Sequence, residues 1–184
     1  MEIFARNFAS LVDAVDDCLA SGRQLPALLL IYTGIDIVSS LEARRGESTS
    51  QAFTRWVIDY MTGAQPLRCT PMELYAARCG LVHTLTAESD LFRAGKVRKV
   101  FYAWGTADAS DLQQTIDVVG ERAVAVHIPS LADTFRRGVM DYMTDLAADK
   151  GRFETVMGAS SMWFTDLKPG VIEAFNAARW PSEP

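Results

Sequence analysis

The sequence has few of the residues that build metal centres and disulfide frameworks. It contains 3 cysteines, none of them in a CxxC spacing, and 2 histidines that lie far apart. An odd number of cysteines argues against a disulfide framework and favours a reducing compartment. A dedicated zinc site needs a cluster of cysteine, histidine or carboxylate ligands. We therefore expect neither a bound metal nor another cofactor.

Long hydrophobic runs are also missing. The longest apolar run, residues 25–32, is too short to span a bilayer. Residues 1–17 carry acids early and have no continuous apolar stretch, so we expect no signal peptide. These features predict a cytoplasmic protein without a membrane segment.

The charge balance limits the partners that the chain can bind. A net charge of −5 disfavours broad electrostatic binding to nucleic acid, although a cleft with a local basic patch is compatible with this total. The sequence has no internal repeats, low-complexity tracts or glycine-rich phosphate loops. With 184 residues, 49% of them apolar, it suffices for one domain with a sizeable core. We expect a helical core at about residues 1–148 and a C-terminal lid or dimer segment at about residues 149–184.

Hydrophobic periodicity predicts a mainly α-helical fold. Six segments have the apolar spacing or density of helices, namely residues 1–21, 25–45, 51–61, 70–88, 110–119 and 131–148. Residues 100–104 and 122–128 are short and β-prone. The pattern favours a four-to-five-helix bundle with a small two-stranded β element.

The most informative stretch is residues 70–88, TPMELYAARCGLVHTLTAE. Thr70, Pro71 and Glu73 form a helix start, because they supply a side-chain cap, a proline at the first helical position and a capping-box acid. The spacing predicts a buried stripe made of Met72, Tyr75, Ala76, Cys79, Val82 and Thr86.

This helix also contains Arg78 and His83, with Gly80 between them. Residues five apart lie about 140° apart around a helix and do not share a face. They can reach one target if the helix loosens after Gly80, or if a second copy of the helix packs across that glycine. Arginine offers a charged planar fork to a phosphate, and histidine can pass a proton near neutral pH. The pair suits phosphodiester cleavage in RNA, whose own 2′-hydroxyl can attack without a metal.

The spacing Arg78-x-x-x-x-His83 near the end of a helix resembles the HEPN superfamily (higher eukaryotes and prokaryotes nucleotide-binding domain). Many of its members are metal-independent RNases in toxin–antitoxin, abortive-infection and CRISPR systems. The resemblance covers roughly residues 1–105. It implies a HEPN-like helical bundle, a homodimer built around this helix, RNA as substrate, and an antitoxin or other protein as partner. It also implies that Arg78 stabilises negative charge on the phosphate and that His83 acts as general acid or base.

Three further residues are expected to support this pair. Asp36 lies in an apolar helix, where a buried carboxylate needs a partner, and either Arg78 or His83 is the natural candidate. The alternative is that Asp36 faces solvent or caps a local backbone group. Tyr75, one turn before Cys79, is expected to line the cleft. Cys79 stands where catalytic HEPN members usually carry Asn, Asp or His, and a cysteine is a weak substitute.

This departure keeps a second function open, a non-catalytic HEPN-like nucleotide- or protein-binding module. A structural alternative is that Arg78 only pairs with an acid and that His83 is a core histidine. Four positive charges follow closely after His83, and they are candidates for gripping an RNA backbone: Arg93, Lys96, Arg98 and Lys99. The alternative for these four is an ordinary solvated loop. His127 is expected to be structural.

Overall fold

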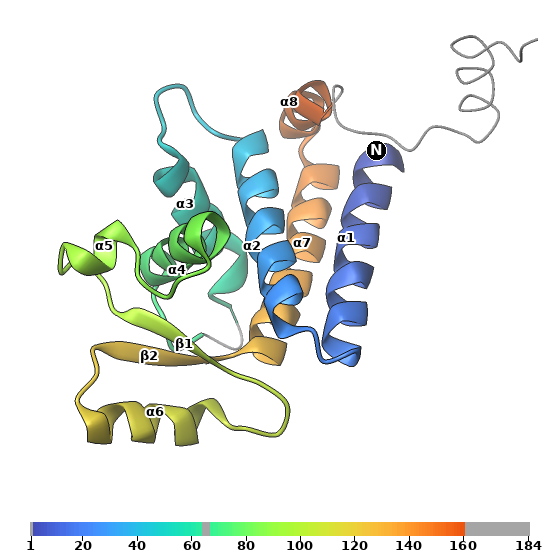
Figure 1. The fold of residues 1–184 in the computed structure, drawn as a ribbon. Helices are drawn as coiled ribbons and strands as arrows, with labels where there is room; N and C mark the ends of the chain where they lie inside the picture. Colours follow the sequence, from blue (N-terminus) through green and yellow to red (C-terminus); the bar gives the residue numbers. More distant parts are fainter. Residues whose placement is uncertain (1, 64–66, 161–184) are drawn as a thin grey trace, which may run out of the picture.

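The computed structural model describes residues 2–63 and 67–160 of the chain. Within these ranges the chain forms eight helices and two strands (Figure 1). The helices are α1 (Glu2–Ala20), α2 (Gln24–Leu41), α3 (Thr49–Met61), α4 (Pro71–Thr84), α5 (Asp90–Arg93), α6 (Ala109–Val119), α7 (Ile128–Ala148) and α8 (Lys150–Ser160). The strands are β1 (Lys99–Ala103) and β2 (Ala123–His127). The predicted mainly helical fold with two strands is confirmed.

The helices form a bundle-like body around α2. This helix contacts α1, α3, α4, α7 and α8, and Figure 1 shows α1, α7 and α2 running side by side. Its apolar sequence fits this central position, because a helix with no polar face is stable only when neighbours cover it. The largest fully buried side chains come from several of these helices and include Tyr32, Phe53, Phe135 and Tyr142. One core therefore holds together segments that lie far apart in the sequence.

By length and composition alone, α2 could also cross a membrane, and it is the one helix of the described ranges that could. Half of it is buried inside the protein. The core helix of a soluble protein passes the same test, so this is weak evidence for a membrane span. The cytoplasmic location stays a prediction.

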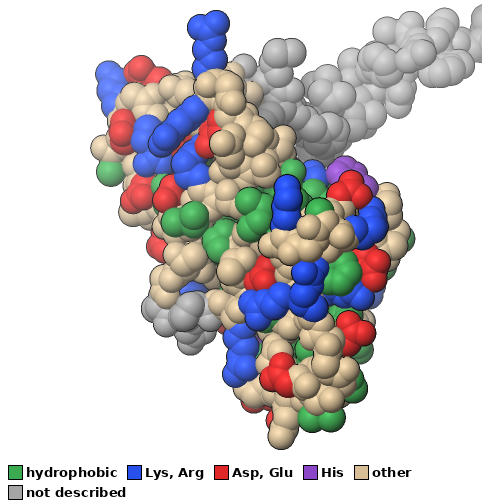
Figure 2. All heavy atoms as spheres, turned by 90° about the vertical axis from the view of Figure 1, so that its left-hand side faces the viewer, with side chains coloured by type: hydrophobic (Ala, Val, Ile, Leu, Met, Phe, Trp, Pro, Cys, Tyr) green, Lys and Arg blue, Asp and Glu red, His purple; other side chains and the backbone are tan. Residues whose placement is uncertain are grey.

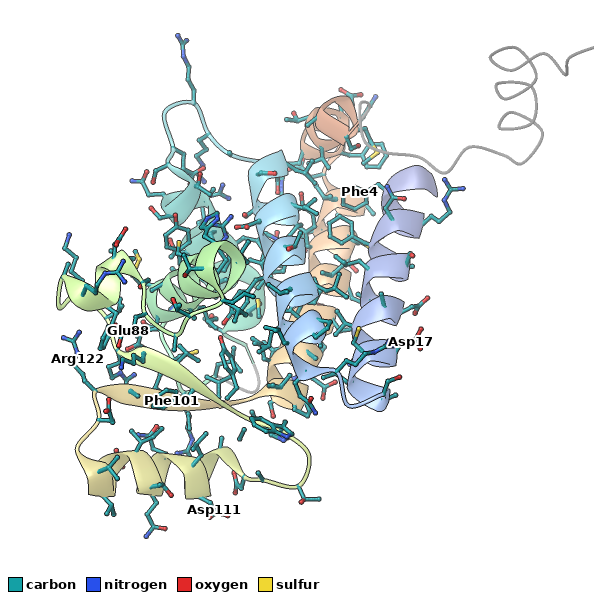
Figure 3. All side chains as sticks on the ribbon, in the orientation of Figure 1. Phe4, Asp17, Glu88, Phe101, Asp111 and Arg122 are labelled. Atoms are coloured by element: carbon teal, nitrogen blue, oxygen red, sulfur yellow. The ribbon has the colours of Figure 1, made fainter. Side chains whose placement is uncertain are left out.

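The two strands form a parallel pair at one end of the bundle. Lys99 lies opposite Ala123, and α6 supplies the crossover that a parallel connection needs. One face of the pair packs on α6, where Phe101 joins the small cluster around Ile116 (Figure 3), and the other contacts α4 and α7. On the outer side of β2, the backbone N–H of Ala125 donates to Gln113 Oε1 at 2.9 Å. This bond protects part of an exposed strand edge.

The start of α4 agrees with its sequence, but its buried face agrees only in part. Thr70 and Glu73 form the capping box, with Glu73 N to Thr70 Oγ1 at 3.2 Å and Thr70 N to Glu73 Oε2 at 2.8 Å. Of the predicted stripe, Ala76 is buried and Tyr75, Cys79 and Val82 are half-buried, whereas Met72, at 40%, and Thr86 are exposed. Apolar residues occur all around this helix, so periodicity could not select a face. Contacts with α3, α2 and β1 select the one that is buried, which consists of Glu73, Leu74, Ala76, Ala77 and Gly80.

The first part of the predicted C-terminal segment packs against the bundle as α8. Arg152 donates to Glu42 through Nε at 2.8 Å and through Nη2 at 2.9 Å, and it also donates to Tyr60 Oη at 2.9 Å. Val156 is fully buried. Residues 161–184, which contain the rest of the predicted lid or dimer segment, lie outside the described residues.

Candidate active site

An ion pair joins α2 to α4 where the two helices pack together. Arg78 Nε donates to Asp36 Oδ2 at 2.5 Å, and Arg78 Nη2 lies at the same distance from that oxygen. The two side chains are only 15% and 18% exposed, respectively. Arg78 is thus the partner of Asp36, as one of the two predicted pairings proposed, and the solvent-facing alternative for Asp36 is wrong.

The same guanidinium reaches His83. Arg78 Nη1 lies 3.0 Å from His83 Nε2. Arginine stays protonated in proteins and can only donate, so Nε2 is the acceptor and the ring proton of a neutral His83 lies on Nδ1. His83 is exposed, whereas Arg78 is mostly buried. Asp36, Arg78 and His83 therefore form a connected series from the interior to the surface, which we call the Asp36–Arg78–His83 cluster.

The arginine side chain is long enough to meet His83 without any change in the helix. The segment from Pro71 to Thr84 remains α-helical, so the predicted loosening after Gly80 is wrong. Gly80 instead permits a close approach of the chain itself, since a Cβ there would lie 2.6 Å from the carbonyl oxygen of Thr86. That space is not available for the predicted crossing of a second copy at Gly80.

The chain turns back at Leu85, the one residue other than glycine with a positive φ among the described residues, at 54°. After this left-handed cap, Thr86 N donates to Gly80 O at 3.2 Å. A leucine in this conformation is uncommon, and its side chain is 63% exposed. Leu85 lies two residues after His83, and both side chains are at the surface where the chain reverses.

Burial disfavours the charged form of both members of the ion pair, but its influence on the balance that sets the pKa differs between them. Burial raises the pKa of Asp36, and this effect exceeds the opposing influence of the hydrogen bond and charge of Arg78. For Arg78, burial is the largest single influence and disfavours the charge, but the hydrogen bond and charge of Asp36 together with Cys79 outweigh it, so the pKa of Arg78 is raised. Asp36 Oδ1 is buried and has no hydrogen-bond partner within the described ranges. The carboxylate therefore keeps an unused acceptor beside a charged guanidinium.

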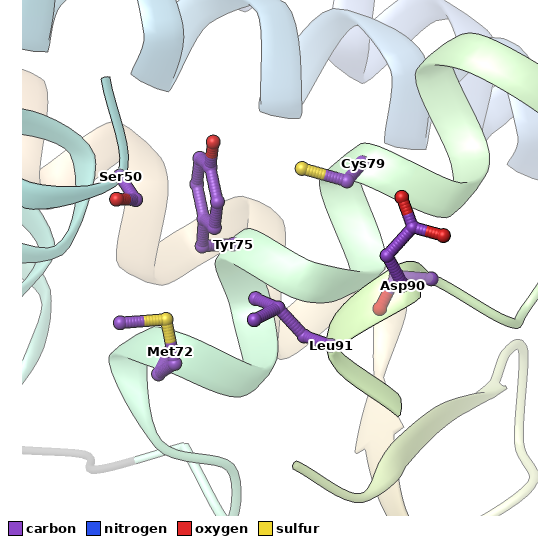
Figure 4. A pocket seen from close by; sticks show the side chains of 7 residues that line it. Ser50, Met72, Tyr75, Cys79, Asp90 and Leu91 are labelled. Atoms are coloured by element: carbon purple, nitrogen blue, oxygen red, sulfur yellow. The ribbon is translucent and has the colours of Figure 1, made fainter. Parts of the chain in front are cut away.

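Cys79 lies beside the guanidinium, and Tyr75 is one helical turn before Cys79. Arg78 Nη1 is 3.9 Å from Cys79 Sγ. Burial raises the pKa of Tyr75, and the neighbouring Cys79 raises it further. Both residues line an open pocket of about 240 Å³ between α3, α4 and α5 (Figure 4). Tyr75 thus lines a pocket next to Arg78, and its part in a catalytic cleft stays a prediction.

Three of the four predicted RNA-binding cations form ion pairs, and two of them, Arg98 and Lys99, pair with acids from other segments. Arg98 donates to the buried Glu73 through Nε at 2.6 Å and through Nη2 at 3.0 Å. Lys99 lies 2.9 Å from Glu88 Oε1 and 3.9 Å from Glu121 Oε2, and its own side chain is only 16% exposed. Through these contacts Arg98 and Lys99 have a structural role that the sequence did not predict.

The other two predicted cations are at the surface. Arg93 pairs with Asp90 and is 59% exposed, and Lys96 is exposed. Figure 2 shows blue side chains alternating with red ones across this face, without one continuous basic patch. The structure therefore leaves Arg93 and Lys96 as the accessible cations of this segment.

Sequence reasoning missed several residues that surround the cluster. Ser89, Asp90 and Leu91 line the pocket beside Cys79, and the only sequence signal for them was a serine followed by an acid at a helix start.

His127 has structural contacts, 3.1 Å from Ser130 Oγ and 3.2 Å from the Gly105 carbonyl oxygen. In the described part of the chain, no group of three or more His, Cys, Asp or Glu residues could hold a metal ion.

Comparison with known proteins gives no match to a family model, to a curated protein or to a solved structure. The function is therefore inferred from the geometry of the site and from the sequence resemblance.

Proposed function

We propose that this chain is a metal-independent endoribonuclease of the HEPN type. The observation that carries the proposal is the Asp36–Arg78–His83 cluster, in which a phosphate-binding cation and a proton-transfer group are in direct contact. Both groups belong to one helix end, and the exposed histidine makes the cluster reachable from solvent. By the HEPN resemblance, the enzyme acts as a toxin or defence RNase and is paired with an antitoxin or other protein.

In the resting protein the donors of Arg78 are directed at Asp36 and His83. A phosphodiester that binds Arg78 Nη1 takes that donor away from His83 Nε2, which becomes free to accept the proton of the 2′-hydroxyl. The 2′-oxygen then forms a bond to phosphorus while the bond to the 5′-oxygen breaks. Arg78 stabilises the charge that develops on the phosphoryl oxygens. The 5′-oxygen leaves with a proton from an imidazolium, and the product carries a 2′,3′-cyclic phosphate.

In this mechanism Asp36 is a positioning residue. Its Oδ2 holds the guanidinium between the two helices, and its charge balances that of Arg78 in the resting state. Cys79 contacts the same guanidinium, and Tyr75 lines the adjoining pocket. A side chain locked by neighbours reacts with less reorganisation than a free one.

A homodimer is part of the proposal. Exposed apolar side chains flank the cluster, with Ile37 next to Asp36 and Leu85 two residues after His83. Apolar surface beside a functional group is typical of a protein–protein contact. A second copy on this face would exclude water from the cluster and would bring a second histidine to the substrate, to act as the acid while the first acts as the base.

A second candidate function is a non-catalytic HEPN-like nucleotide- or protein-binding module. The neutralisation of Arg78 by Asp36 favours this alternative, as do the ion pairs of Arg98 and Lys99, because few cations remain for an RNA backbone. Cys79, at the position after Arg78, also favours the non-catalytic module.

Incubation of the purified protein with a mixed RNA pool in EDTA separates the two. We expect the wild type to produce fragments with 2′,3′-cyclic phosphate ends. His83→Gln should cleave at least about 100-fold more slowly, since general acid–base catalysis contributes 10²–10⁴-fold. His127→Gln is the matched control, because it changes the other histidine, and it should cleave like the wild type.

The variants are compared after circular dichroism and size-exclusion chromatography show the same fold and oligomeric state. Equal cleavage by wild type and His83→Gln would assign the activity to a contaminant or another site. Absence of cleavage by the wild type would remove the catalytic proposal and leave the binding module.

A further inference from the structure

We infer that the pocket beside Cys79 binds one nucleobase, and that it prefers guanine next to the phosphate that Arg78 holds. This inference rests on the proposed function and adds a substrate preference to it. The pocket is lined by Ser50, Met72, Tyr75, Cys79, Ser89, Asp90 and Leu91 (Figure 4).

The position of the pocket connects it to the cluster. Cys79 forms part of its wall, and the sulfur of Cys79 lies 3.9 Å from Arg78 Nη1. A base inside the pocket is therefore within one nucleotide of a phosphate on that guanidinium. The volume of about 240 Å³ is below the range of about 300–1,000 Å³ for sites of drug-sized ligands, which suits a single flat ring system.

The walls have the chemistry of a base site. Tyr75 supplies an aromatic ring, and an edge contact with Phe53, with ring centroids 5.5 Å apart, fixes the orientation of that ring. Met72 and Leu91 complete an apolar lining on the same side. Single-stranded RNA is recognised mainly by unstacked bases that lie on aromatic rings and form hydrogen bonds along their edges. A fixed ring also costs less conformational entropy when a base stacks on it.

Asp90 decides which base fits best. Its carboxylate lines the pocket, is 95% exposed, and pairs with Arg93 through Oδ1. An ionised carboxylate only accepts hydrogen bonds. Guanine presents two adjacent N–H donors, N1–H and the 2-amino group, that match the two oxygens of a carboxylate. The other three bases lack this pair. Arg93, predicted to grip the RNA backbone, pairs with Oδ1 of Asp90, so guanine shares that oxygen with Arg93, because a carboxylate oxygen can accept two hydrogen bonds.

Binding of free nucleotides tests the pocket without cleavage. The wild-type protein is titrated with guanosine, adenosine, cytidine and uridine 5′-monophosphates by calorimetry. Guanosine monophosphate should bind about tenfold more tightly than each of the others, the discrimination expected of one good bidentate contact. Asp90→Asn should reduce this preference to less than about threefold. Tyr75→Leu should weaken binding of all four by about tenfold.

Asp111→Asn is the matched control, since Asp111 is also an acid in the first turn of a helix but lies on α6, beyond the sheet (Figure 3). It should bind all four nucleotides as the wild type does. Equal affinities for the four nucleotides in the wild type would overturn the inference. So would a guanine preference that Asp90→Asn leaves unchanged.

Cleavage of oligonucleotides with a single guanine in a pyrimidine background gives the second readout. Cuts should cluster beside the guanine with the wild type and spread along the strand with Asp90→Asn. Cleavage in EDTA without any base preference would remove the pocket assignment and leave the proposed function intact. If the protein binds guanine selectively through Asp90 but cleaves no RNA, the pocket assignment stands and the proposed function is removed.

Discussion

The two ends of α4 carry one arginine–carboxylate pair each, and the pairs differ in how completely the carboxylate is used. At the start of the helix, Glu73 accepts hydrogen bonds on both oxygens, from Arg98 and from Thr70 N. Near its end, Arg78 contacts only Oδ2 of Asp36, and Oδ1 stays buried without a partner in the described ranges. The guanidinium there also extends to the exposed His83.

The protonation behaviour follows this difference. Burial opposes the charge of Glu73, but the hydrogen bonds from Arg98 and Thr70 outweigh it, so the pKa of Glu73 is lowered. For Asp36 burial is the stronger influence and the pKa is raised. A saturated pair fixes structure, whereas an unsaturated pair retains donors and acceptors for a ligand. Under the proposed function, the start of α4 contributes stability and its end carries the chemistry.

The largest expected change in stability is at the start of the helix. Glu73→Gln removes the charge that Arg98 and the capping box share, and we expect the free energy of unfolding to fall by about 2 kcal/mol. Because the pKa of Glu73 is lowered on folding, the wild type also loses stability as the pH falls below the ordinary glutamate value of about 4.3. The variant should lose less in that range. Urea unfolding between about pH 3 and about pH 7, a range that brackets this value, measures both effects. A variant as stable as wild type would show that this pair is not structural.

A smaller change is expected at the other end from Gly80→Ala. The added methyl group would meet the Thr86 carbonyl oxygen, and the cost of overpacking should exceed the gain in helix propensity by about 1 kcal/mol. The matched control is Gly158→Ala in α8, where a Cβ meets nothing within 4 Å, and this variant should be more stable by about 0.5–1 kcal/mol. If both substitutions stabilise the protein, the return of residues 86–88 across α4 is wrong.

The smallest change is expected from Asp36→Asn, which tests whether the second pair is stabilising at all. The pKa of Asp36 is raised on folding, so its charged form costs stability at neutral pH, and that cost fades as the pH falls toward the unfolded value of about 3.9. Asparagine imitates the protonated acid. The substitution removes the cost of the buried carboxylate but also leaves Arg78 without its counter-charge, and we expect these two effects to offset each other to within about 0.5 kcal/mol at pH 7. A loss as large as that of Glu73→Gln would make the two pairs equivalent and would remove the contrast between them.

Local sequence signals predicted the start of α4 and the strands well. The capping box and Pro71 lie within one helical turn, so neighbouring residues alone determine them. The two strands were predicted from two short β-prone runs on either side of a helical segment, and the structure adds that they pair in parallel. Asp36 could be assigned a cationic partner, because a carboxylate in an apolar helix requires one.

Tertiary contacts account for what the sequence did not predict. The ion pairs of Arg98 and Lys99 involve Glu73 and Glu88 from other segments, and no local pattern indicates them, while their contact with RNA stays a prediction. The buried face of α4 is chosen by its neighbours, since the helix is apolar on all sides. Gly80 was read as a contact point for a second copy, although the chain itself fills the space.

The most direct test compares RNA cleavage in EDTA by Arg78→Lys and Arg98→Lys, at a temperature where both variants are folded. Lysine keeps the charge but loses the planar fork, so Arg78→Lys should cleave at least about 100-fold more slowly than the wild type. Arg98→Lys should stay within about threefold of the wild type, because its partner Glu73 serves the structure of the helix start. Equal losses in both variants, or full activity in Arg78→Lys, would contradict the assignment of chemistry to the end of α4.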